Sequence, residues 1–206
     1  LAFYMGDDST GEYIYKYVSD AKWEVKDING GYTAGDKYLN SGTLYVAKFD
    51  FDERSQKASG EWLELNIRDP RIAGYAAYQF ADQADVLVHS RLVADALGAT
   101  KMDRPEWCAV NPNNGEVYVT LTNNSNRGKA YPTDAANPRH YFDNDSGSTS
   151  LKGNINGHII RLREQNEQTS ATKFVWDVFL FGAEADALKN VNLSGLSDAN
   201  DFSSPD

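Results

Sequence analysis

The chain has 206 residues, of which 41% are hydrophobic and 12% aromatic, and this is enough to build the buried core of one domain. Its formal net charge of −10 argues against binding to nucleic acid or to anionic membranes, and no apolar run is long enough to span a membrane. Cys108 is the one cysteine, which excludes an internal disulfide. The surplus of carboxylates suits hard cations such as Ca²⁺, although acidity that only aids solubility is the more common case.

The first third of the chain is rich in β-forming residues. Their alternation predicts strands at 1–5, 12–18, 42–50 and 60–66. Glycines and asparagines between residues 27 and 42 predict a loop. Because the chain begins within a predicted strand and stops where a turn should lead onward, we expect it to be an internal piece of a longer protein.

Residues 72–97 have a different pattern, with frequent alanine and apolar residues at roughly helical spacing. These apolar positions are Val86, Leu87, Leu92, Val93, Ala96 and Leu97. Gly98 is suited to the end of a helix. We therefore predict a small helical insertion of one or two helices between strands.

The β pattern resumes after the helical insertion. Strands are predicted at 107–110, 116–122, 158–163 and 173–181. The polar stretch 123–156 predicts a long loop, and the tail from Gly182 onward predicts a loop with at most one helical turn.

An internal repeat organises these elements. A proline followed by an acid precedes a strand at Pro105-Glu106 and occurs again at Pro205-Asp206, and Gly11-Glu12-Tyr13 matches Gly157-His158-Ile159 in pattern. Four antiparallel strands per unit are typical of a propeller blade, so we predict an all-β fold, a β-propeller fragment with a small helical insertion. A β-sandwich, which also uses short strands and turns, is the alternative. The predicted division is the end of one blade at 1–71, the helical insertion at 72–97, a full blade at 105–181 and the start of a further blade at 202–206.

The acids at the starts of the blades are candidate metal ligands. The first strand of a blade lines the central channel, so Glu106 and Asp206 would meet at the channel mouth, where carboxylates repel unless a cation lies between them. Ordinary turns with solvated carboxylates explain the same spacing. The planar guanidinium of Arg104 matches phosphate oxygens, which favours a role in phosphate binding. The alternative is a surface ion pair with Asp103, which would contribute little to stability. The sequence has no Gly-rich phosphate loop, so any phosphate chemistry would be metal-based.

Several long stretches resemble the PhoX-type alkaline phosphatases. They are Leu97-Gly98-Ala99-Thr100-Lys101-Met102-Asp103-Arg104-Pro105-Glu106-Trp107, Met5-Gly6-Asp7-Asp8 followed by Glu12-Tyr13-Ile14-Tyr15-Lys16, and Gly157-His158-Ile159-Ile160-Arg161. The resemblance extends over nearly the whole chain. It implies a six-bladed propeller, exported by the twin-arginine route, that hydrolyses phosphomonoesters with a cofactor of ferric iron and calcium.

The resemblance also implies roles for individual residues. Glu106 would be a metal ligand, and Arg104 would contact the phosphate and act as the catalytic residue. Glu12 matches another metal ligand, and Asp206 falls where the family continues into a further blade with acidic ligands. Independently of the family, Arg91 on the predicted helix could add positive charge for substrate binding, although arginines are common on helix surfaces.

Three further candidates have a structural alternative. Asp7 and Asp8 suit calcium, but an acidic turn is an equal explanation. His158 matches Glu12 in the repeat and could point into the channel, although a histidine on a strand is more often a structural hydrogen-bonding residue. The iron-binding cysteine of the family lies in an earlier segment, so Cys108 is expected to be a buried, inert thiol.

The leading hypothesis is a fragment of a periplasmic or secreted phosphomonoesterase that acts as a monomer on small-molecule phosphate esters. A ring of six blades cannot close from this length, so we expect the chain alone to be inactive. A calcium-dependent propeller lactonase and a non-catalytic propeller that binds a partner are the alternatives. Elemental analysis would separate them, with iron and calcium, calcium alone, or neither as the outcomes.

Overall fold

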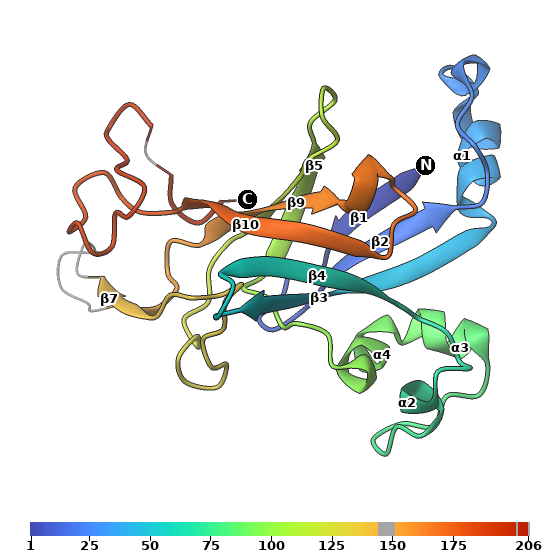
Figure 1. Cartoon of the computed structure of the whole chain (residues 1–206), viewed down its shortest axis with the longest axis horizontal. Helices are drawn as coiled ribbons and strands as arrows, with labels where there is room; N and C mark the ends of the chain where they lie inside the picture. The colour runs from blue at the N-terminus through green and yellow to red at the C-terminus, as the bar shows by residue number, and fades with distance from the viewer. Residues whose placement is uncertain (144–150, 201, 206) are drawn as a thin grey trace.

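A large antiparallel sheet dominates the computed structural model, which describes residues 1–143, 151–200 and 202–205 (Figure 1). Within these residues the sheet has eight strands in the order β1-β2-β3-β4-β10-β9-β6-β5, and a separate hairpin pairs β7 with β8. The strands of the large sheet are β1 (Ala2–Gly6), β2 (Ile14–Ser19), β3 (Gly42–Asp52), β4 (Lys57–Glu64), β5 (Pro105–Val110), β6 (Val117–Leu121), β9 (His158–Glu164) and β10 (Lys173–Phe181). The hairpin strands are β7 (Tyr141–Asp143) and β8 (Leu151–Gly153).

The large sheet consists of two groups of four neighbouring strands, β1 to β4 and β5, β6, β9 and β10. Strands β4 and β10 join the groups by pairing over a short stretch, from Lys173 opposite Glu61 to Val175 opposite Ser59. The strands predicted from the sequence are all present within a few residues of their predicted positions. The predicted division of the chain into blades stays a prediction.

The sheet curls so far that its two outermost strands approach each other. Gly6 at the end of β1 lies against the start of β5, and a Cβ atom at this position would meet the Pro105 carbonyl oxygen at 2.4 Å. A residue with a side chain would therefore push the two strands apart. Glycine at position 6 allows the backbones of β1 and β5 to come this close.

The main core fills the space between the two groups of strands. Alternation in β9 buries every second residue, as expected for a strand with one face on a core. Both groups contribute to the same buried cluster, whose members include Ile14, Ala47 and Trp62 from the first group and Val119, Ile160, Leu162, Phe174 and Trp176 from the second. The two inner faces therefore pack against each other.

Three short helices cover the opposite face of the first group and gather on one side of the sheet (Figure 1). They are α2 (Pro70–Ala73), α3 (Gln83–Val88) and α4 (Ser90–Leu97). Asp69 and Asp82 cap the first two helices, and Gly98 ends α4 in the left-handed conformation with φ of 68°. A small helical insertion between strands is therefore present, with three short helices where one or two were predicted.

Two predicted loops contain regular structure. Residues 27–42, predicted as a loop, include helix α1 (Gly31–Leu39) behind the 3₁₀ turn η1 (Val25–Asp27). The Tyr38 hydroxyl accepts a hydrogen bond from the Glu24 amide and donates to Asp27, and these contacts hold the glycine-containing helix. The predicted loop 123–156 contains the β7–β8 hairpin, with residues 144–150 outside the described residues. A second 3₁₀ turn, η2 (Gln165–Glu167), follows β9. None of the helices in the described part of the chain is both long and apolar enough to cross a membrane.

A buried ion pair lies inside the sheet. Lys16 of β2 donates to Glu164 of β9 at 3.0 Å and to the Ala171 carbonyl oxygen at 2.6 Å. Tyr4 and Trp62 donate to the same carboxylate at 2.7 and 3.2 Å. Burial lowers the pKa of Lys16 and raises the pKa of Glu164, and the attraction between the two charges opposes both changes. Each charge therefore depends on the other.

The substitution Lys16→Met tests this dependence. Removing one partner leaves the Glu164 charge buried without a counter-ion, so we expect the free energy of unfolding to fall by about 3 to 5 kcal/mol. Adding Glu164→Gln to the same protein should restore much of the loss, because no buried charge remains. Urea denaturation of the two variants measures the difference. Equal stability of the single and double variants would contradict the proposed dependence.

Candidate functional site

Two segments that are far apart in the sequence lie side by side at the candidate site. The amide of Gly11 donates to the Met102 carbonyl oxygen at 3.0 Å, and the amide of Met102 donates to the Glu12 carbonyl oxygen at 2.8 Å. Thr10 and Asp103 form a further bridge between the segments. We call these two segments the first site segment (residues 7–12) and the second site segment (residues 100–106). Their pairing brings most of the predicted site residues into one region.

Arg104 lies between two carboxylates. Its Nη2 atom is 2.9 Å from Asp8 Oδ1 and 3.5 Å from Glu106 Oε1. The backbone of Arg104 has φ of 52°, in the left-handed region that residues with side chains rarely adopt. Its side chain is 31% exposed, so ligands in solution can reach it. The structure thus places Arg104, Glu106 and Asp8 together.

Glu12 is buried beside helix α4. Its Oε1 atom accepts a hydrogen bond from Arg91 Nε, and Arg91 Nη1 also lies 3.4 Å from Asp95 Oδ2. The Tyr13 hydroxyl donates to Asp95 Oδ1 at 2.6 Å. The helical insertion therefore contacts the first site segment through charged and polar groups, and Arg91 is paired with Glu12 and Asp95.

Among the residues that the structure describes, Glu12 Oε2 is a buried oxygen atom without a hydrogen-bond partner, and Glu12 is 7% exposed. The neighbouring Tyr15 is also 7% exposed. Burial raises the pKa of Tyr15, a contact with the Ser90 side chain opposes this change, and the nearby carboxylates of Glu12 and Asp7 add to it. A buried carboxylate oxygen without a donor is costly, so Glu12 Oε2 is suited to a cation or another donor at this position.

Comparison of the sequence and the structure with known proteins shows the family of this chain. The family model described as alkaline phosphatase PhoX matches residues 1–206. The chain belongs to the PhoX alkaline phosphatase family. A solved structure of Pseudomonas fluorescens PhoX in complex with vanadate, a transition state analogue, is similar to it with a TM-score of 0.77 and 37% sequence identity. The match covers 100% of this chain and 33% of that one. A comparison with curated proteins finds no match.

This similarity confirms two predictions from the sequence. The resemblance to PhoX-type phosphatases was correct, and the all-β, propeller-like fold of the fragment agrees with the PhoX structure. The chain spans about a third of the length of the PhoX chain that it matches, at 33% of that chain.

The carboxylates of the two site segments are of the type that a metal site in a PhoX family member requires. Carboxylates such as those of Glu12, Glu106 and Asp8 are the hard oxygen ligands that calcium takes. Among the residues that the structure describes, no three His, Cys, Asp or Glu side chains converge closely enough to hold a metal ion by themselves. Asp206, the remaining predicted ligand, lies outside the described residues. The oxygen atoms of these carboxylates are chemically suited to calcium, and the described residues do not form a metal site by themselves.

Cys108 has the character of an inert thiol. It packs against the main core from β5, and burial raises its pKa to about 12. A thiol with such a pKa stays protonated near neutral pH and is a poor nucleophile. The expected inert character of Cys108 is in keeping with this pKa.

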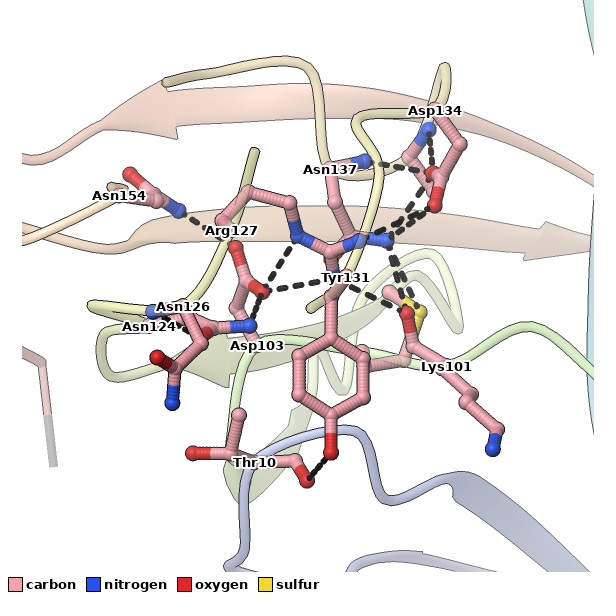
Figure 2. A network of polar contacts seen from close by, with 12 residues as sticks. Thr10, Lys101, Asp103, Asn124, Asn126, Arg127, Tyr131, Asp134, Asn137 and Asn154 are labelled. Atoms are coloured by element: carbon pink, nitrogen blue, oxygen red, sulfur yellow. Dashed lines mark hydrogen bonds and ion pairs between the residues drawn. The ribbon is translucent and has the colours of Figure 1, made fainter. Parts of the chain in front are cut away.

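A buried network next to the site was not predicted (Figure 2). The Asp103 carboxylate is fully buried and accepts hydrogen bonds from Arg127 and from Asn124 at 2.8 and 2.6 Å through Oδ1, and from Asn154 at 3.0 Å through Oδ2. The surface pair between Asp103 and Arg104, which we considered from the sequence, is therefore wrong. Residue 127 falls in a stretch predicted as a polar loop, and no spacing in the sequence connects it with Asp103.

His158 belongs to the same buried region and is fully buried there. Its Nδ1 atom lies 2.9 Å from Asn154 Nδ2 and its Nε2 atom 2.8 Å from the Ala136 carbonyl oxygen. These partners suit a neutral ring that accepts from the amide and donates to the carbonyl. Burial is the main cause that lowers the pKa of His158 to about 4. The histidine is enclosed by its hydrogen-bond partners, as in the structural alternative considered above.

The pH dependence of stability tests this assignment. The pKa of His158 falls from 6.5 to about 4 on folding, so the unfolded chain binds more protons between these values. We expect the free energy of unfolding to decrease by up to about 3 kcal/mol between pH 6.5 and pH 4 because of this residue. Denaturation of the wild-type protein and of His158→Gln across this range measures the contribution. The same pH slope in both proteins would rule out the assignment.

Proposed function

We propose that the protein carrying this sequence hydrolyses phosphate monoesters to an alcohol and inorganic phosphate, with Arg104 as the group that binds the phosphoryl oxygens. The observation that carries this proposal is the position of Arg104, which is partly exposed and paired with Asp8 and Glu106. Membership of the PhoX family and the vanadate complex of the Pseudomonas fluorescens protein support it.

Arg104 is suited to a charged, tetrahedral ligand. Its guanidinium has five N–H donors in a planar fork, and its contacts with Asp8 and Glu106 are made through Nη2. The remaining donors can bind phosphate oxygens in the bidentate manner that this fork favours. A fixed positive charge at this position stabilises the negative charge that develops on the transferring phosphoryl group.

We propose Glu12 and Glu106 as metal ligands, with Asp206 as a third outside the described residues. Calcium and iron are the proposed cofactors, and the chemistry that they supply when bound is Lewis-acid stabilisation of phosphoryl oxygens. Glu12 Oε2, which is buried without a donor, is the atom best placed to bind a cation. Arg91 holds the other oxygen of this carboxylate, and its predicted contact with substrate remains a proposal.

The proposal extends to the whole protein. Because the chain matches 33% of the PhoX chain and its described residues give an incomplete ligand set, we propose that other parts of the protein complete the site and that this chain alone is inactive. We also propose a monomeric protein of the periplasm or of the secreted fraction, in keeping with the family.

Substitutions at the phosphate-binding region test the proposed function. We expect Arg104→Ala and Glu106→Ala to reduce the turnover of p-nitrophenyl phosphate by the whole protein by about 100-fold or more, because each removes a group that stabilises phosphoryl charge or a metal. The control is Arg54→Ala in the exposed turn between β3 and β4, which should retain wild-type turnover.

Metal analysis completes this test. A calcium chelator should abolish the turnover of the wild-type protein, and added calcium should restore it. Turnover that survives both substitutions would eliminate the proposed site. Calcium without iron, together with hydrolysis of lactones, would instead identify the lactonase, and a metal-free protein without hydrolytic activity would identify a binding module.

A further inference from the structure

Residues 124–137, which we call the clamp loop, contact both site segments. The loop follows β6 and lies beside the buried Asp103 carboxylate (Figure 2). Arg127 and Tyr131 are among the loop residues that contact the rest of the fold. Arg127 reaches the second site segment and Tyr131 reaches the first. The clamp loop is therefore in a position to set how the two segments lie relative to each other.

The Arg127 guanidinium binds both a side chain and a backbone carbonyl of the second site segment. The guanidinium donates to Asp103 Oδ1 through Nε at 2.8 Å, and its Nη2 atom lies 2.7 Å from the same oxygen. Nη2 also donates to the Lys101 carbonyl oxygen at 3.1 Å, and Nη1 donates to the Pro132 carbonyl oxygen at 2.6 Å. Arg127 is 1% exposed, so these contacts replace the hydration that a charged side chain loses on burial.

Tyr131 holds the first site segment. Its hydroxyl donates to the Thr10 carbonyl oxygen at 3.1 Å. Its ring lies against Gly11, where a Cβ atom would be 2.3 Å from the ring and where φ is +80°, so only glycine suits this position. The Arg127 guanidinium lies 6.0 Å from the centre of the same ring. The residue that binds the second site segment therefore lies next to the residue that binds the first.

The position of Arg104 depends on this arrangement. Arg104 directly follows Asp103 and has a left-handed backbone conformation, which persists only where the surroundings determine it. The carboxylate of Asp8, which Arg104 contacts, lies in the first site segment. Any change in the distance between the segments therefore changes the pairing of Arg104 with Asp8.

We propose that Arg127 is a positioning residue that, with Asp103 and Tyr131, fixes the two site segments against each other and thereby aims Arg104. The clamp itself is independent of the reaction, whereas its effect on phosphate binding rests on the function proposed above. Lysine cannot replace Arg127, because a single ammonium lacks the planar fork that reaches Asp103, Lys101 and Pro132 together.

Amide hydrogen exchange in the whole protein tests the clamp without any need for activity. We expect Arg127→Lys to speed exchange of the Gly11 and Met102 amides, which pair the two segments, by about tenfold or more. Lys16→Met is the matched control, since it also breaks a buried ion pair but does not contact either site segment. In the control, exchange of these two amides should stay within about twofold of the wild-type rate when compared under conditions of equal global stability.

Inhibition by vanadate tests the effect on Arg104. The inhibition constant for vanadate should rise by about tenfold in Arg127→Lys and stay unchanged in Lys16→Met, because only the first variant moves the phosphate-binding residue. Tyr131→Phe, which removes one hydroxyl and keeps the ring, provides a milder variant if Arg127→Lys does not fold. It should speed exchange at Gly11 more than at Met102.

The outcomes separate the clamp from the proposed function. The clamp would be overturned if exchange were accelerated equally in Arg127→Lys and Lys16→Met. If Arg127→Lys does not fold, exchange at the wild-type rate in Tyr131→Phe would overturn it. Faster exchange with an unchanged vanadate constant would overturn the aiming of Arg104. If vanadate does not inhibit the wild-type protein, the proposed function fails, while the exchange rates still decide whether the clamp exists.

Discussion

The buried charge of Asp103 is the constraint on which the site region depends. A carboxylate with no exposure to water is stable only if donors surround it, and here Arg127, Asn124 and Asn154 provide them. These donors come from the segment after β6 and from the end of the β7–β8 hairpin. Satisfying one carboxylate therefore requires three parts of the chain to meet, and the backbone on either side of Asp103 is held in place as a result.

Two buried ion pairs perform different tasks in this fold. The Lys16–Glu164 pair connects the two groups of strands across the core, where Tyr4 and Trp62 also donate to the carboxylate. The pair of Asp103 with Arg127 lies beside the site segments instead. In both cases the attraction offsets the loss of hydration only while both partners are present, so each pair makes the local structure sensitive to a single substitution.

At the candidate site, exposed charged side chains are held in place by buried contacts. Arg104 and Asp8 are accessible, but the segments that carry them are joined by backbone hydrogen bonds and held by the clamp loop. Helix α4 also contacts Glu12 through Arg91. The helical insertion and the clamp loop thus both support the site, although neither belongs to the strands of the large sheet.

The sequence by itself determined the strands, the helical insertion and the family, because hydrophobic alternation, helical spacing and long motifs are local properties of the chain. It also identified Arg104 and Glu106, which lie in one such motif and do come together. Only the tertiary structure decided that Asp103 pairs with Arg127 and that Arg91 pairs with Glu12. The physical reason is that a buried charge takes whichever partner the packed loops bring to it, and that partner is not encoded by spacing along the chain.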